Sequence, residues 1–146
     1  MQLNIKRLEG NDLELPSYGS PQSAGFDVRA CIADDVVMKP MDRIAIPTGL
    51  AIALPEGYEA QARPRSGLAL KNGITIINTP GTIDSDYRGE LKIILINLSK
   101  EDFIIHRGDR IAQIVIKPVL QVEFNEVDEL DKTERGEGGF GSTGIK

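Results

Sequence analysis

Two aspartates and a tyrosine lie close together in the segment GTIDSDYRGE, residues 81–90. A carboxylate near a substrate can orient and deprotonate a water molecule, and a tyrosine ring can pack against an organic group. Glycine and aspartate are also the residues that turns use most often, so on this segment alone a polar turn in a glycine-bounded hairpin is the favoured interpretation. The residues alone do not decide which of Asp84 and Asp86 would act as the base.

A second candidate is PRSG, residues 64–67, which combines a guanidinium, a hydroxyl and backbone amides. We expect one or two helical turns here, with Ser66 as the N-cap and the Asn72-Gly73 pair as the end. Such groups at the start of a helix are typical of anion binding, although a plain helix cap also accounts for them.

The third candidate is the glycine-rich segment RGEGGFGSTG, residues 135–144. Its free amides and Arg135 suit a polyphosphate, and Phe140 on a flexible arm could stack on a nucleobase. A disordered chain end is the alternative. The glycines match the G-x-G-x-x-G pattern, but a dinucleotide fold needs a helix after it and the chain is too short to form one. Together the three segments indicate an enzyme that handles nucleotide phosphates.

Composition narrows the class of protein. The 146 residues suit one domain, and the formal charge of −5 argues against a nucleic-acid binder while allowing a small anionic substrate. The single cysteine, Cys31, is typical of a small buried side chain in a reducing, cytoplasmic setting. With His106 as the only histidine, no Cys/His metal cluster or Ser–His pair is expected. We expect no membrane span and no secretory signal.

The hydrophobic period is two in segments 49–57, 90–97 and 102–116, with a turn at 107–109. This pattern predicts an all-β fold, a jelly-roll-like barrel or sandwich with one short helix. Both faces of 90–97 are apolar, so Ile94 and Ile96 could contact a neighbouring sheet or a neighbouring subunit. From residue 125 the chain is charged and then glycine-rich, so we expect a β core at 1–124 and a C-terminal arm at 125–146.

Five segments resemble, in order, the five motifs of the homotrimeric dUTP diphosphatase (dUTPase) family. They are AGFDVRA (24–30), PRSGLA (64–69), GTIDSDYRGE (81–90), RGDRIAQIVI (107–116) and RGEGGFGSTG (135–144). The resemblance implies a jelly-roll-like homotrimer whose active sites are each built from three subunits. It implies Mg²⁺-dependent hydrolysis of dUTP to dUMP and pyrophosphate, which limits uracil incorporation into DNA and supplies dUMP for dTMP synthesis.

The resemblance also implies roles for residues. Asp84 would be the catalytic base that activates a water for attack on the α-phosphorus, and Asp86 only a turn residue. Tyr87 would pack on the deoxyribose and exclude a 2′-hydroxyl. Asp27 would act through the waters of a Mg²⁺ ion that is held chiefly by phosphates and water.

The implied substrate-binding residues form three sets. The set around the uracil is Asn78 and Gly81, with backbone groups near Thr82, Ile83 and Lys92. The set at the phosphates is Arg65, Ser66 and Gly67, assisted by Gln113. The set on the arm, which would close over a site formed by other subunits, is Arg135, Phe140, Gly141, Ser142 and Thr143, with Phe140 stacked on the uracil.

Two alternatives stay open. A dCTP deaminase has a similar fold but looks to need a glutamate where this chain has Ile94. A non-catalytic trimeric binding protein could reuse the fold without its chemistry.

Overall fold

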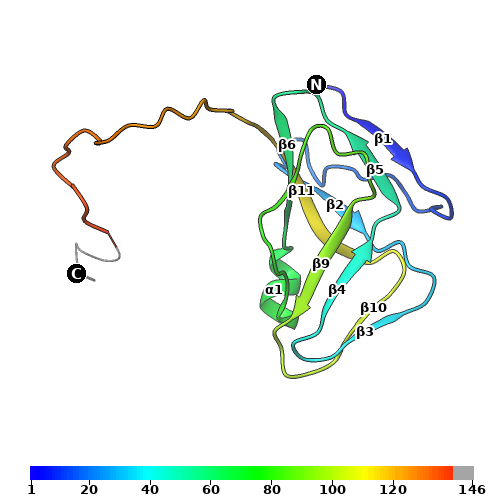
Figure 1. Ribbon diagram of the computed structural model, residues 1–146. Helices are drawn as coiled ribbons and strands as arrows, with labels where there is room; N and C mark the ends of the chain where they lie inside the picture. The colour runs from blue at the N-terminus through cyan, green and yellow to red at the C-terminus, as the bar shows by residue number, and fades with distance from the viewer. Residues whose placement is uncertain (140–146) are drawn as a thin grey trace.

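The computed structural model describes residues 1–139, and these form eleven strands and one short helix (Figure 1). The strands are β1 (Asn4–Arg7), β2 (Phe26–Arg29), β3 (Val36–Met38), β4 (Arg43–Pro47), β5 (Leu50–Ala53), β6 (Tyr58–Arg63), β7 (Ile74–Ile76), β8 (Gly81–Ile83), β9 (Lys92–Asn97), β10 (Phe103–Ile105) and β11 (Arg110–Pro118), and the helix is α1 (Ser66–Asn72). The all-β, jelly-roll-like prediction is confirmed.

The strands pair antiparallel throughout the described residues. They form a four-stranded sheet in the order β2-β11-β6-β8, a three-stranded sheet in the order β4-β9-β7, and two pairs, β1-β5 and β10-β3. The inward side chains of these sheets make one continuous core that is dominated by aliphatic residues. Since side chains alternate between the faces of a strand, the period of two in the sequence follows directly from this packing.

Strand β9 lies in the segment 90–97, for which the sequence predicted that both faces are covered. Ile93 and Leu95 point into the core and are buried. On the opposite face Ile96 is also buried, whereas Ile94 is 39% exposed. The chain therefore covers only part of that face.

The hairpin predicted for residues 81–90 is wrong. Strand β8 pairs with β6, whereas β9 pairs with β4 and β7, so the segment between them crosses from one sheet to the other. A turn within it is closed by the Tyr87 amide, which donates to the Asp84 carbonyl at 3.2 Å. Glycine and aspartate favour a turn in either arrangement, and only long-range pairing decides which strands become neighbours.

Helix α1 ends as predicted, with Gly73 in the left-handed conformation at φ 66°. Its start differs from the prediction: the N-cap is Arg65, no side chain caps the helix, and Ser66 is the first helical residue. Tertiary contacts account for this, because the Gln113 amide donates to the Pro64 carbonyl and the Arg65 guanidinium pairs with Asp27. These bonds hold Arg65 extended, just outside the helix.

The loop that carries Arg107 ties the N-terminal segment to the body. Its guanidinium donates to the carbonyls of Gly10 and Ile32 and pairs with Asp12. Cys31 is partly buried rather than fully buried, with its Sγ 3.7 Å from Nη1 of Arg107.

The chain leaves the body after β11. Val119 donates to the Gly57 carbonyl, and the residues that follow run out as an exposed, extended segment (Figure 1). This departure precedes residue 125, and the division into a core and an arm stays a prediction. Within residues 1–139 no helix is long and apolar enough to cross a bilayer.

Asn97 generates a prediction about stability. Its buried amide donates to the carbonyls of Met38 at 2.9 Å and Glu101 at 2.8 Å, and its carbonyl accepts from the Ser99 amide. Asn97→Ala removes these three hydrogen bonds, and the Glu101 carbonyl keeps a second donor, the Ser99 hydroxyl, so urea denaturation should show about 2–4 kcal/mol lower free energy of unfolding. The exposed Asn125→Ala should change it by less than about 0.5 kcal/mol. A loss below about 1 kcal/mol for Asn97→Ala would contradict this account.

Candidate functional site

One pocket gathers several of the residues that the sequence singled out. It has a volume of about 220 Å³. Its lining comprises Thr82, Ile83, Asp84, Tyr87 and Lys92 from the predicted set, together with Glu90, Leu91, Ile93 and Ile114. The buried aliphatic side chains give the pocket an apolar wall, and the charged groups stand at its edge. This combination suits a flat organic ring with a polar rim.

The loop of residues 84–90 is held in one shape by its own hydrogen bonds. The Tyr87 hydroxyl donates to the Glu90 carbonyl at 3.0 Å, and Arg88 donates to the carbonyls of Ser85 and Tyr87. Asp84 is exposed at the start of this loop, where its carboxylate can reach a water molecule. Tyr87 is 46% exposed and presents its ring to the pocket.

Glu90 also lines this pocket, although it was not among the predicted site residues. Its Oε1 accepts from the Gly49 amide at 2.9 Å, and its Oε2 lies 3.7 Å from Nζ of Lys92. The sequence does contain a signal for its role: Glu90 and Lys92 are two residues apart, and in an extended chain alternate residues lie on the same face. The carboxylate therefore helps to fix the position of the Lys92 ammonium.

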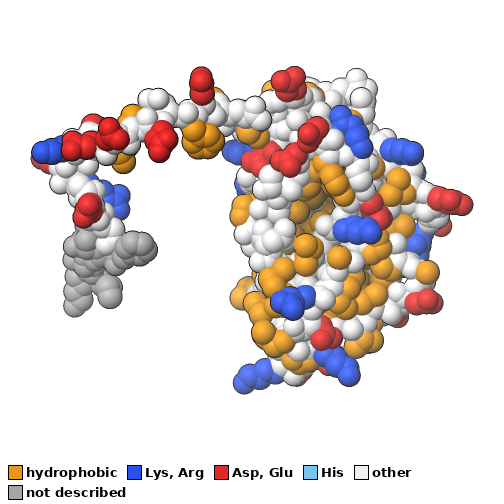
Figure 2. Space-filling model, in the orientation of Figure 1, with side chains coloured by type: hydrophobic (Ala, Val, Ile, Leu, Met, Phe, Trp, Pro, Cys, Tyr) orange, Lys and Arg blue, Asp and Glu red, His pale blue; other side chains and the backbone are white. Residues whose placement is uncertain are grey.

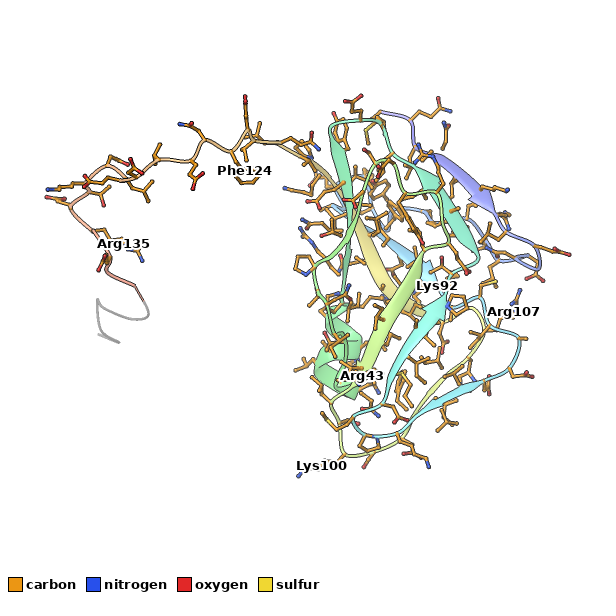
Figure 3. All side chains as sticks on the ribbon, viewed as in Figure 1. Arg43, Lys92, Lys100, Arg107, Phe124 and Arg135 are labelled. Carbon is orange, nitrogen blue, oxygen red and sulfur yellow. The ribbon has the colours of Figure 1, made fainter. Side chains whose placement is uncertain are left out.

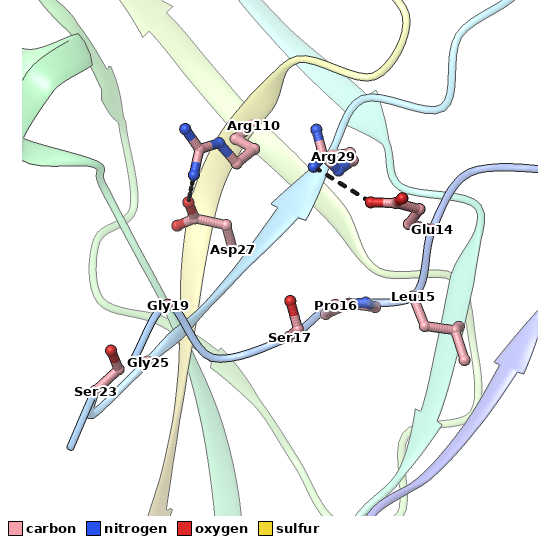
Figure 4. Close-up of a pocket in the computed structure, with 10 residues that line it drawn as sticks. All are labelled: Glu14, Leu15, Pro16, Ser17, Gly19, Ser23, Gly25, Asp27, Arg29 and Arg110. Carbon is pink, nitrogen blue, oxygen red and sulfur yellow. Dashed lines mark ion pairs between the residues drawn. The ribbon is translucent and has the colours of Figure 1, made fainter. Parts of the chain in front are cut away.

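A second group of predicted residues surrounds Asp27. Oδ2 of Asp27 lies 3.1 Å from Nε of Arg65 and 3.3 Å from Nη1 of Arg110, and Figure 4 shows the Arg110 pair. Nη1 of Arg65 also donates to the Arg110 carbonyl at 3.1 Å. Gln113 donates to the Pro64 carbonyl at 2.9 Å. Arg110 was missed because nothing in the sequence shows that β11 lies beside β2.

A polar pocket of about 270 Å³ opens beside Asp27 (Figure 4). On its far side Arg29 lies 3.9 Å from the exposed carboxylate of Glu14. Each arginine of this pocket, Arg29 and Arg110, thus faces a carboxylate, and the pocket carries no excess of positive charge.

The two groups lie at opposite edges of one sheet. Asp27 is on the edge strand β2, level with Gln113 and Arg63, whereas Asp84 follows the other edge strand, β8, beyond the pair of Ile83 with Ala60. Asp27 and Asp84 are three strand spacings apart across the sheet, which is roughly 14 Å. They are also about four residues apart along the strands, which is roughly 13 Å. A single chain therefore does not bring Asp84 and Arg65 to one reacting phosphate.

The remaining predicted residues are placed as follows. Ser66 and Gly67 are exposed at the start of α1, beside Arg65. Asn78 is exposed, and its amide lies against Gly81, where an added Cβ would come within 3.3 Å of the amide nitrogen. Arg135 lies in the extended segment and donates to the Gly138 carbonyl. Phe140, Gly141, Ser142 and Thr143 lie outside the described residues.

The described residues offer no cluster of three or more His, Cys, Asp or Glu side chains that could hold a metal ion. The Asp27 carboxylate is engaged with two arginines, yet it keeps lone pairs that can accept from a water molecule. An oxygen donor of this kind, which acts through a water molecule, is one that a Mg²⁺ ion accepts.

The fold and these two groups define a class, a jelly-roll protein with an exposed carboxylate beside an apolar pocket and a separate group of guanidinium side chains, an arrangement that suits a hydrolase acting on an anion. The family model described as dUTPase matches residues 11–144. The chain belongs to the dUTPase family and is, by family, an enzyme that hydrolyses dUTP.

Two relatives named deoxyuridine 5′-triphosphate nucleotidohydrolase carry this assignment. The Fusobacterium nucleatum protein is 58% identical over 144 residues, covering 99% of this chain and 97% of its own. The Hydrogenobaculum sp. protein is 58% identical over 146 residues, covering all of both chains.

Solved structures agree with the fold. A mutant dUTPase of Staphylococcus bacteriophage 80alpha with dUpNHpp has a TM-score of 0.85 at 30% identity, covering 99% of each chain. A mutant dUTPase from phage phi11 of S. aureus, described with a structural Mg(II) ion, has a TM-score of 0.81 at 26% identity. It covers 90% of this chain and all of its own.

His106 lies outside both groups and was not expected to be catalytic. Its Nδ1 lies 2.9 Å from Oδ2 of Asp35, on the surface. The hydrogen bond and the charge of Asp35 raise the pKa of His106 above its ordinary value, with a smaller contribution from Asp109.

This pair predicts a pH dependence. An NMR titration of the imidazole should give a midpoint above the ordinary value of about 6.5, and Asp35→Asn should lower it. Because the folded-state pKa is raised, the pair stabilises the fold at low pH, and this contribution is lost as the pH rises through the folded-state pKa. Asp35→Asn should therefore lower the denaturation midpoint more at pH 5 than at pH 8.5. An equal loss at both pH values would contradict the assignment.

Proposed function

We propose that the chain hydrolyses dUTP to dUMP and pyrophosphate at sites shared among the three subunits of a homotrimer, with Asp84 as the catalytic base. The reaction keeps dUTP out of DNA and supplies dUMP for dTMP synthesis. The observation that carries the shared site is the separation of Asp84, beyond the edge strand β8, from the Arg65 guanidinium, which lies against Asp27 on the opposite edge strand β2. The single cysteine of the sequence supports a reducing, cytoplasmic setting.

The chemistry follows from the exposed carboxylate of Asp84. This group takes a proton from a water molecule, and the water oxygen forms a bond to the α-phosphorus. The bond from that phosphorus to the oxygen bridging to the β-phosphate breaks, and pyrophosphate leaves with the electron pair. A second subunit that supplies Arg65 would place the phosphate charge next to a guanidinium as the bond breaks.

The pocket at Asp84 would hold the nucleoside. Tyr87 would pack on the deoxyribose, and Asn78 with backbone groups of residues 81–83 and Lys92 would read the uracil edge. The volume of about 220 Å³ in one chain is below the ~300–1,000 Å³ of typical small-molecule pockets. This small volume is consistent with a wall supplied by another subunit.

The phosphates would be held by Arg65, Ser66 and Gly67, with Gln113 holding the loop that carries them through its bond to Pro64. Mg²⁺ would enter with the triphosphate, bound by phosphate oxygens and water, and would offset the negative charge of the phosphates. Asp27 would accept a hydrogen bond from a metal-bound water while Arg65 and Arg110 hold its carboxylate in place.

The surface over β9 supports the homotrimer. Ile94 is partly exposed, Leu98 lies four residues further on the same face, and Ile77 donates its amide to the Ile94 carbonyl. Figure 2 shows apolar side chains gathered over the strands on this face. An exposed apolar row of this kind is typical of a subunit interface.

The extended segment supports a closing arm. Leu120, Val122 and Phe124 alternate along it and are exposed, and Figure 3 shows Phe124 on this segment away from the body. Apolar side chains of this size are expected to pack on a protein surface. We therefore expect residues 125–146 to cross to a site formed by other subunits. Arg135, Ser142 and Thr143 would then bind the γ-phosphate, Gly141 would offer an amide there, and Phe140 would stack on the uracil.

Asp84→Asn tests the catalytic base. The amide keeps the size of the side chain but cannot take a proton, so kcat for pyrophosphate release should fall by about 10²–10⁴-fold while dUTP binding survives. Asp86→Asn is the matched control in the same loop and should retain most of the activity. Turnover by Asp84→Asn within tenfold of the unaltered enzyme would exclude this role.

Removal of residues 135–146 tests the arm. The truncated chain should lose nearly all turnover but keep its unfolding midpoint, because the arm contributes little to the core. Mixed trimers of the truncated chain and Asp84→Asn should recover part of the activity, since some sites then receive Asp84 from one chain and the arm from another. No recovery in trimers shown by mass to be mixed would contradict a site shared among subunits.

A further inference from the structure

The ring of Tyr87 packs directly on the backbone of Gly89. A Cβ placed on Gly89 would lie 2.3 Å from Oη of Tyr87, 2.5 Å from Cζ and 2.9 Å from Cε2. Real Cβ atoms essentially never approach another atom within 3.0 Å. Gly89 is not among the residues with left-handed φ, so its backbone tolerates a side chain, and an added Cβ would collide with the far end of the Tyr87 ring in its present position.

The same ring is fixed by its hydroxyl. Oη of Tyr87 donates to the Glu90 carbonyl at 3.0 Å, and the Glu90 carboxylate accepts from the amide of Gly49, in the turn between β4 and β5. One contact limits how close the ring lies to the loop, and the other limits its rotation. The Tyr87 ring therefore has one packing position, at the edge of the pocket that also contains Asp84.

We propose that Gly89 determines the selectivity for deoxyribose over ribose, by giving the Tyr87 ring a packing position that leaves no space for a 2′-hydroxyl. The proposal rests on the proposed packing of Tyr87 against the sugar. Gly89 is a positioning residue, since it acts through Tyr87 and does not itself contact the substrate.

A methyl group at position 89 must move the ring by roughly 1 Å to reach ordinary van der Waals contact. A bound sugar blocks movement of the ring in its own direction, so we expect the ring to rotate away from the sugar. This rotation opens space for a 2′-hydroxyl and lowers the preference for dUTP, expressed as the ratio of kcat/KM for dUTP to kcat/KM for UTP. Selectivity for a single small group typically amounts to about 10–200-fold, which sets the size of the expected loss.

The experiment compares Gly89→Ala, Tyr87→Ala and the double variant, with pyrophosphate release from dUTP and UTP as the readout. Gly89→Ala should lower the preference for dUTP by about tenfold or more. In the Tyr87→Ala background, Gly89→Ala should change the preference by less than about twofold, because the colliding ring is gone. Gly19→Ala is the matched control: its Cβ would meet only Ser23 Oγ at 3.8 Å, so the preference should not change.

The outcomes separate the inference from the function on which it rests. An unchanged preference in Gly89→Ala, or a further loss in the Tyr87→Ala background, overturns the role of Gly89 alone. An unchanged preference in Tyr87→Ala overturns the packing of Tyr87 on the sugar and the inference with it. If Gly89→Ala fails to fold, recovery of folding in the double variant would demonstrate the collision, and failure of both would overturn it.

Discussion

The register of the four-stranded sheet is the constraint on which the rest of the structure depends. It fixes Asp27 and Gln113 in one row near the start of α1, and it fixes Asp84 beyond the far edge strand. Hydrogen bonds between β6 and β11 hold this register. A shift of one strand by one residue would also turn its buried side chains outward, so the separation of Asp27 from Asp84 is rigid. If Asp84 and Arg65 act on one substrate, as proposed, they can meet there only across a subunit boundary.

The loop of residues 84–90 places Asp84 and Tyr87 at one pocket because it crosses between the sheets. A paired hairpin would use its backbone groups in ladder bonds and would twist its side chains to alternating faces. Here the loop instead bonds to itself, through Tyr87 to Asp84 and through Arg88 to Ser85. Asp84 and Tyr87 therefore face one pocket from a short segment that lies between two rigid strands.

The strands and the helix end could be predicted because they depend on local patterns, such as the alternation in residues 90–97 and the glycine at 73. The partners of those strands could not, which is why the hairpin at 81–90 and the cap at Ser66 were predicted wrongly. Glu90 and Arg110 were missed for the same reason, since each acts through contacts with residues far away in the sequence. The motifs identified most of the polar residues of the two groups. That these groups lie at opposite edges of one sheet follows only from the order of its strands, which the sequence does not give.

Charge along the chain bears on how an anionic substrate can be accommodated. The extended segment is strongly acidic between residues 123 and 134, with Lys132 as its only cation, and Figure 2 shows these carboxylates along it. Such a segment would repel a triphosphate if it lay over the phosphates. Arg135 follows directly after the acidic stretch. If the arm closes over a site, the acidic part must therefore lie along the outside of a neighbouring subunit, and only the chain from Arg135 onward can approach the phosphates.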